Sequence, residues 1–166
     1  MPRPCSLALI ISLAISSASA QNAAPPRFEQ YRVVEIFHGT PADPILASSE
    51  QRNYRTRIRD GVLKTPSVNF AGHYSIVRWG CGSQCVMMAI VDAKTGIIYP
   101  PPPSGTGSEL YIPLDNLSDM KVDFRADSQL LVLRNACRDF RNRTTCGIYY
   151  LNWENNRFSL LKFIPN

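Results

Sequence analysis

The chain has 166 residues, of which 45% are hydrophobic, and its 18 Lys or Arg against 13 Asp or Glu give a formal net charge of +5. A chain of this length suits one domain with a single hydrophobic core. The basic excess is too small to predict nucleic-acid binding, which needs a concentrated basic surface. Beyond residue 20, no apolar run is long enough to predict a membrane-spanning helix.

Residues 1–20 have the pattern of a secretory signal peptide. Arg3 provides a positive start, residues 7–15 form a short apolar centre, and a small-residue triplet ends at Ala20 as a cleavage site. Cys5 precedes the apolar centre, whereas a lipid-modified cysteine would stand at the cleavage point. We therefore expect an exported protein, periplasmic or secreted after cleavage near Ala20, without a lipid anchor.

The mature chain begins with a polar lead, residues 21–27, which contains two prolines and is expected to be flexible. Residues 28–166 are expected to form a single β-rich domain, because no strong internal repeat divides them. Within this domain, residues 31–37, YRVVEIF, are rich in β-branched and aromatic side chains. This composition predicts the first strand.

One segment, residues 48–60, has the pattern of an α-helix. Ser48 and Gln51 have the spacing of a capping box, in which each side chain accepts a hydrogen bond from the other residue's backbone N–H. Gly61 follows and predicts the end of the helix, because glycine tolerates the left-handed conformation found after many helices. We expect this short helix to pack on the β-rich part of the domain.

The central stretch, residues 70–92, predicts two neighbouring strands. Residues 70–79 alternate between two faces, and residues 86–91 are almost entirely apolar, which is typical of a strand buried on both faces. Residues 92–96, DAKTG, predict a turn, and residues 97–99 predict the return strand. The two expected faces of the first strand are His73, Ser75, Val77 and Trp79 on one side and Tyr74, Ile76 and Arg78 on the other.

A proline- and glycine-rich segment, residues 100–108, predicts a surface loop, and a β-meander is expected after it. The strands of the meander are expected at residues 122–125, 129–134, 147–153 and 158–164, with turns at residues 127–128 and 155–156. Residues 137–146 are polar and basic and predict a loop closed at its base by cysteines. The expected fold is mainly β: a single antiparallel sheet, a meander or a sandwich, with one short helix and disulfide staples.

Four cysteines remain after removal of the signal peptide: Cys81, Cys85, Cys137 and Cys146. An even number in an oxidising compartment predicts two disulfides, for which three connectivities exist. We favour the local pairs, Cys81 with Cys85 and Cys137 with Cys146, and the crossed pairing is the alternative. Each bridge would stabilise the domain by about 2–4 kcal/mol, mainly by restricting the unfolded chain.

Several motifs support a resemblance to one protein family. They are NFAGHYSIVRWGCGSQC at residues 69–85, Asp92 with Thr95-Gly96, Asp127-Ser128, and Tyr149-Tyr150 with Trp153. In these motifs the chain resembles small exported bacterial proteins of unassigned function that carry a NFAGHY…WGCGxxC core. The resemblance covers most of residues 50–160 and implies a shared scaffold. It implies no activity, so function must be argued from the chemistry of the residues.

The first interpretation of the central stretch is structural. Gly80 and Gly82 would form a tight corner around Cys81, and a bridge to Cys85 would lock it. A rigid corner with aromatic side chains and an arginine beside it would also be a preorganised binding platform, because these residue types dominate interface energetics. The expected binding residues are Tyr74, Arg78, Trp79, Gly80 and Gly82.

A cysteine enzyme is the alternative interpretation. Cys81 with His38 or His73 would supply a thiolate nucleophile and its base. The sequences around His38 and Cys81 are distantly similar to the motifs of L,D-transpeptidases, which are exported acyl-transfer enzymes. The match is incomplete, because Arg78 stands where those enzymes have the serine of their serine-x-glycine-cysteine motif. A disulfide-bonded Cys81 would also lack the thiolate.

A soft-metal site is a further alternative that the spacing does not favour. Its ligands would be His73, Cys81, Cys85, Met87 and Met88, which match no recognised metal-binding pattern. No metal and no cofactor are therefore expected. The favoured prediction is a non-enzymatic binding or inhibitor module of the cell envelope. Its expected partner is an envelope or extracellular protein or glycan, with neither nucleic-acid binding nor a membrane span.

Overall fold

The computed structural model describes residues 24–64, 68–82, 85–102, 111–113, 121–140 and 143–166. The predicted signal peptide, its cleavage site and most of the proline- and glycine-rich segment at residues 100–108 lie outside these described residues. Within them, no helix is long and apolar enough to cross a membrane.

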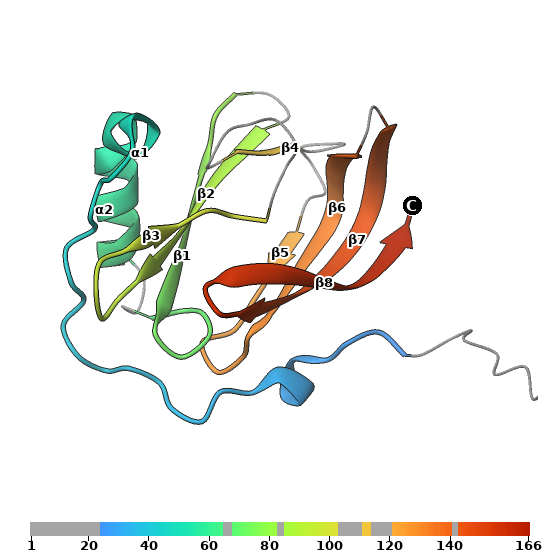
Figure 1. The fold of residues 1–166 in the computed structure, drawn as a ribbon, viewed down its shortest axis with the longest axis horizontal. Coiled ribbons are helices and arrows are strands. Elements are labelled where there is room, and N and C mark those ends of the chain that lie inside the picture. The colour runs from blue at the N-terminus through green and yellow to red at the C-terminus, as the bar shows by residue number, and fades with distance from the viewer. Residues whose placement is uncertain (1–23, 65–67, 83–84, 103–110, 114–120, 141–142) are drawn as a thin grey trace, which may run out of the picture.

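The fold contains two antiparallel sheets of four strands each (Figure 1). The first sheet consists of β1 (Tyr74–Gly80), β2 (Cys85–Asp92), β3 (Ile98–Tyr99) and β4 (Tyr111–Pro113). In it β2 is central and pairs with the other three strands. The second sheet is the meander β5 (Lys121–Asp123), β6 (Leu130–Phe140), β7 (Arg143–Glu154) and β8 (Arg157–Pro165). The prediction of a mainly β fold is confirmed.

The main hydrophobic core lies between the two sheets, so the fold is a β-sandwich. The first sheet contributes Tyr74, Ile76, Met88 and Ile90, and the second contributes Leu131, Leu133, Tyr149, Leu151 and Trp153, all of them buried. This arrangement confirms the predicted alternation along β1. Full burial of each large aliphatic side chain contributes about 1.5–3 kcal/mol, so the sandwich interior is the main source of stability.

Two helices, α1 (Ser49–Asn53) and α2 (Arg55–Lys64), cover the outer face of the first sheet (Figure 1). The buried residues between the helices and the sheet are Ile58 and Val62 from α2, Val77 from β1, Met87, Ala89 and Val91 from β2, and Ile98 from β3. Strand β2 is therefore buried on both faces, as its apolar run predicts. The capping box is also confirmed, because Ser48 Oγ accepts from Gln51 N–H and Gln51 Oε1 accepts from Ser48 N–H.

The prediction that Gly61 ends the helix is wrong, because α2 continues to Lys64. A Cβ atom at Gly61 would overlap the Val77 side chain on β1. Glycine at this position lets the helix backbone approach the sheet more closely than any other residue would. Tertiary packing explains the glycine here, and a helix-termination signal does not.

The prediction of a strand at residues 31–37 is also wrong. Tyr31 is the last residue of a 3-10 helix, η1 (Phe28–Tyr31), which packs with Phe28 on the outer face of the second sheet. The chain from residue 32 to residue 47, here named the strap, then runs from the second sheet to the first (Figure 1). Val33 N–H donates to Asp127 O and Phe37 N–H donates to Gly72 O, so the strap is attached to loops and does not join a sheet.

The segment at residues 137–146 forms a hairpin and not the predicted basic loop. Strands β6 and β7 continue in register to Phe140 and Arg143, with Cys137 directly opposite Cys146. The two cysteines form a disulfide, with their Cα atoms 4.1 Å apart. The predicted pairing is confirmed, whereas the predicted loop was inferred from polar composition alone.

We expect Gly61→Ala to destabilise the protein by about 1–3 kcal/mol, although alanine is the better helix former, because the new methyl group would overlap Val77. Urea denaturation would measure the change. Gly80→Ala is the matched control, since a Cβ there meets no atom within 4 Å, and its stability should change by less than about 0.5 kcal/mol. Equal effects of the two substitutions would contradict the packing argument.

Candidate functional site

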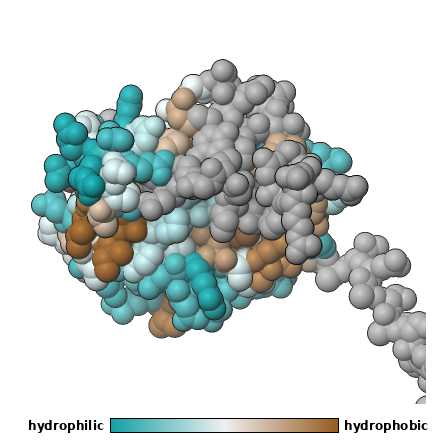
Figure 2. All heavy atoms as spheres, turned by 45° about the horizontal axis from the view of Figure 1, so that its top comes forward, coloured by the Kyte–Doolittle hydropathy of each residue, from teal (hydrophilic) through white to brown (hydrophobic). Residues whose placement is uncertain are grey.

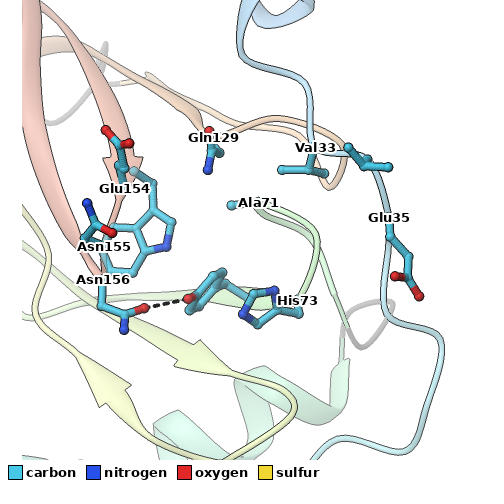
Figure 3. A pocket seen from close by; sticks show the side chains of 11 residues that line it. Val33, Glu35, Ala71, His73, Gln129, Glu154, Asn155 and Asn156 are labelled. Carbon is cyan, nitrogen blue, oxygen red and sulfur yellow. Dashed lines mark hydrogen bonds between the residues drawn. The ribbon is translucent and has the colours of Figure 1, made fainter.

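An open pocket of about 400 Å³ lies where the strap passes the end of the sandwich (Figure 3). We name it the His73 pocket. The strap forms one side and the turn between β7 and β8 forms the other, with His73 between them. Its lining residues are Val33, Val34, Glu35, Ala71, His73, Tyr74, Gln129, Trp153, Glu154, Asn155 and Asn156. On the face drawn in Figure 2, hydrophobic side chains form separate patches among hydrophilic ones.

A tight turn before β1 positions His73 and Tyr74. The predicted strand begins at Tyr74 and not at residue 70, because Ala71 and Gly72 have positive φ values of 44° and 84°. Phe70 and Tyr74 close the turn by exchanging backbone hydrogen bonds of 3.0 and 2.9 Å. A Cβ atom at Gly72 would lie 2.7 Å from Glu35 O of the strap, so glycine is required where the strap crosses this turn.

The opposite side of the pocket is the two-residue turn at Asn155 and Asn156, which confirms the predicted turn. Both residues have positive φ values, 52° and 59°, in the conformation that asparagine tolerates better than most residues. Asn156 Oδ1 accepts a hydrogen bond of 2.6 Å from the Tyr74 hydroxyl, drawn as the dashed line in Figure 3. This bond fixes the turn to the start of β1.

The floor of the pocket is a buried pair of aromatic side chains, Tyr74 and Trp153. Tyr74 and Trp153 are 7% and 2% exposed, and their rings meet edge to face with centroids 5.2 Å apart. Burial raises the pKa of Tyr74 above its ordinary value of 10.0, and a hydrogen bond with the Trp153 side chain opposes this rise. The Tyr74 hydroxyl donates a hydrogen bond to Asn156 Oδ1.

His73 is the titratable group closest to this floor. Its ring lies against the Tyr74 ring, with centroids 4.1 Å apart, and its Nε2 is 4.0 Å from Asp92 Oδ1. Burial lowers the pKa of His73 below its ordinary value of 6.5, with Asp92 raising it and Lys94 lowering it further. The Asp92 oxygens also accept from Lys94 N–H and from the Thr95 hydroxyl. His73 is therefore a neutral imidazole at pH 7.

The polar groups of the pocket are mainly amides and carboxylates. None of the described residues that line the pocket is Ser, Thr, Cys or Lys, so it offers no hydroxyl, thiol or amine nucleophile of those types. Its rim instead carries the amides of Gln129, Asn155 and Asn156 and the carboxylates of Glu35 and Glu154. An aromatic floor with convergent polar groups is the usual composition of a small-ligand site.

The five predicted binding residues do not form one surface. Tyr74 belongs to the His73 pocket, whereas Trp79 lies on the other face of β1 and packs against Tyr54, with ring centroids 5.3 Å apart. Arg78 lines a different pocket. Along β1, Tyr74 and Trp79 are separated by about 16 Å, at about 3.3 Å per residue.

The two predicted corner glycines also differ from each other. Gly80 is the last residue of β1, and a Cβ there would meet open space. Gly82 follows the strand with a φ of +124°, which other residues rarely adopt. The backbone therefore requires glycine only at Gly82, and the predicted tight corner does not depend on Gly80.

The residues of the alternative cysteine enzyme are not assembled into a site. Cys81 is disulfide-bonded, and so it is not a free thiolate. The side chain of Cys85, its predicted partner, lies outside the described residues. His73 precedes β1 and Cys81 follows it, which places them about 25 Å apart along the extended strand. His38 is exposed on the strap.

The soft-metal alternative also lacks a common site. Met87 packs in the cluster beneath the helices and Met88 in the sandwich core, on opposite faces of β2. Within the described part of the chain, no three His, Cys, Asp or Glu side chains are grouped so that they could hold a metal ion.

Comparisons with family models, with curated proteins and with solved structures found no match. The function must therefore be argued from the geometry of the chain itself. Sequence reasoning identified Tyr74 and His73 but missed the other side of the pocket. The available signal was the pair Asn155-Asn156 directly after a predicted strand that ends in aromatic residues.

We expect the bond between Tyr74 and Asn156 to give a measurable coupling energy. Tyr74→Phe and Asn156→Gly should each destabilise by about 1–2 kcal/mol, because each leaves a buried polar group without its partner. Glycine preserves the positive φ of the turn. A double-mutant cycle measured by urea denaturation should give a coupling of about 1 kcal/mol. Asn155→Gly, on the same turn, should instead be additive with Tyr74→Phe.

We also expect stability to fall as the pH decreases through the His73 transition. Because the folded-state pKa of His73 is lowered, the unfolded chain binds more protons below its ordinary pKa of 6.5. The free energy of unfolding is therefore highest above 6.5 and decreases as the pH falls toward the folded-state pKa. His73→Gln should reduce this decrease between about pH 8 and pH 5 in chemical denaturation. An unchanged decrease in His73→Gln, or an equal reduction in His38→Gln, would contradict the assignment.

Proposed function

We propose that the protein is an exported, non-enzymatic binding domain of the cell envelope whose His73 pocket holds an uncharged glycan. The observation that carries this proposal is the pocket itself: a buried aromatic floor under a rim of amides and carboxylates. Sugar hydroxyl groups donate and accept hydrogen bonds, and amide and carboxylate side chains supply both kinds of partner. A volume of about 400 Å³ falls within the range of small-ligand sites.

The charges around the pocket favour a ligand without negative charge. Glu35 and Glu154 lie on opposite sides of the rim, and both are exposed. An anionic ligand would be repelled by these carboxylates, and a neutral His73 offers no compensating charge. Hydroxyl groups, in contrast, can donate hydrogen bonds to the carboxylates and are not repelled by them. The rim thus supports a neutral, hydroxyl-rich ligand over an anionic one.

The rigidity of the pocket supports binding as its role. Tyr74 and Asn156 are joined by a hydrogen bond, and the strap is tied to the His73 turn through Phe37 and Gly72. A site that is already ordered loses less conformational entropy when it takes up a ligand. The two sides of the pocket are thus held in place before any ligand arrives.

Export is part of the proposal and rests on the sequence of residues 1–20. The disulfide between Cys137 and Cys146 is compatible with it, because such bonds persist in oxidising compartments. Glycans are abundant polymers of that environment. The compartment and the proposed ligand are therefore consistent with each other.

The test uses tri-N-acetylglucosamine as an uncharged glycan probe in an NMR titration of the mature protein. We expect saturable shifts confined to the His73 pocket, and a loss of affinity of about tenfold in Asn155→Gly, which removes an amide while preserving the positive φ. Asn53→Ala removes an exposed amide at the end of α1 and should bind like the wild type. Shifts elsewhere, or equal affinity in Asn155→Gly, would count against the glycan site.

A further inference from the structure

A second pocket of about 400 Å³ lies at the edge of the sandwich where β1 and β5 come together. Its lining residues are Phe28, Arg78, Val122, Asp123, Phe124 and Arg125. We name it the Arg78 pocket. It shares no lining residue with the His73 pocket. Along β1, Arg78 and Tyr74 are about 13 Å apart.

Arg78 is a cation without a polar partner in this pocket. Its guanidinium carbon lies 5.5 Å from the centroid of the Phe124 ring, in a cation–π contact. Burial lowers the pKa of Arg78 below its ordinary value, and Asp123 only partly opposes this effect. Among the described residues, no group forms a hydrogen bond or ion pair with the Arg78 guanidinium, whereas the Arg78 backbone pairs with Met88 on β2. The side chain nevertheless remains accessible to solvent.

The neighbouring carboxylates are already paired with other arginines. Asp123 Oδ2 accepts a hydrogen bond of 2.8 Å from Arg134 Nε. Glu29 Oε1 accepts one of 2.8 Å from Arg125, whose guanidinium also lies 4.5 Å from the Phe28 ring centroid. These pairs leave the positive charge of Arg78 without a matching negative charge.

We propose that the Arg78 pocket binds an oxyanion, either a carboxylate or a phosphate group. The planar guanidinium of Arg78 can donate two parallel hydrogen bonds to two oxygens of such a group. A bound anion would supply the counter-charge that the described part of the protein does not provide to Arg78, because Asp123 is already paired with Arg134. The Phe124 ring lies beside the guanidinium and supplies no hydrogen-bond acceptor, so the N–H groups of Arg78 are available to a ligand.

This inference does not depend on the glycan proposal, because it rests on different residues and on the opposite charge preference. The His73 pocket carries two rim carboxylates, whereas the Arg78 pocket carries two arginines and one carboxylate that is already paired. Either site can therefore fail its test without affecting the other.

The experiment is an NMR titration of the mature protein with inorganic phosphate, with sodium chloride adjusted to keep the ionic strength constant. We expect saturable shifts of the Arg78 side-chain Nε–H signal and of the amides at residues 122–125, with a dissociation constant on the order of millimolar. Arg78→Gln should weaken binding by about tenfold or more. Arg78→Lys should bind phosphate with an affinity between those of the wild type and Arg78→Gln, because lysine keeps the charge but cannot donate the two parallel hydrogen bonds.

Arg157→Gln is the matched control. It removes the same charge from an exposed position on β8, outside the pocket, and should bind phosphate like the wild type. Arg78→Gln should remain folded in circular dichroism, because the lost guanidinium has no polar partner among the described residues. If Arg78→Gln and Arg157→Gln weakened phosphate binding equally, the effect would come from net charge alone and the proposal would be overturned. Shifts that do not saturate would also overturn it.

A second titration tests whether the pocket binds a free oxyanion or an oxyanion group carried by a larger molecule. Glucose 6-phosphate carries the same group on a larger molecule, and glucose is the uncharged comparison. Tighter binding of glucose 6-phosphate than of phosphate would assign the site to an oxyanion carried by a larger ligand, and equal binding would assign it to the free ion. Binding of glucose as tight as that of glucose 6-phosphate would overturn the assignment to an oxyanion.

Discussion

The structure depends on the burial of the β1–β2 pair on both of its faces. Tyr74, Ile76, Met88 and Ile90 face the second sheet, while the alternate residues of the same two strands face the helices. Neither face of the β1–β2 pair can be exposed to solvent at low free energy, because each is a continuous apolar surface. This requirement explains why α2 lies so close to β1 that Gly61 has no room for a side chain. It also explains why a second sheet is needed.

The turn before β1 connects this core to the candidate site. Gly72 accepts from Phe37 of the strap through its carbonyl and donates 2.7 Å to Ala126 O of the loop before β6. The two following residues, His73 and Tyr74, therefore have little freedom. Tyr74 is at once a core residue and the floor of the pocket. A change in the packing of β1 would thus be transmitted directly to the His73 pocket.

The sequence predicts those features that local patterns determine. Alternation placed Tyr74 and Val77 on opposite faces of β1, and the spacing of Ser48 and Gln51 predicted the capping box. The errors concern features that depend on distant residues. Residues 31–37 have strand composition, but they form only an isolated bridge between Arg32 and Ser128 and no strand. The Tyr74 bond to Asn156 joins residues 82 positions apart, a distance over which no sequence pattern connects them.

The two-residue alternation that directs side chains of β1 into the core also directs one side chain into each pocket. On the inner face of β1, Tyr74, Ile76 and Arg78 follow one another, and only Ile76 lies wholly within the apolar core. The residues on either side of it line the two pockets, each of which also includes residues of the second sheet. Tyr74 and Arg78 are tolerated at these positions because the apolar part of each side chain packs against the protein while its polar end reaches the pocket. A single strand therefore contributes Tyr74 to a pocket rimmed by amides and carboxylates at its beginning and the cation Arg78 to a second pocket near its end.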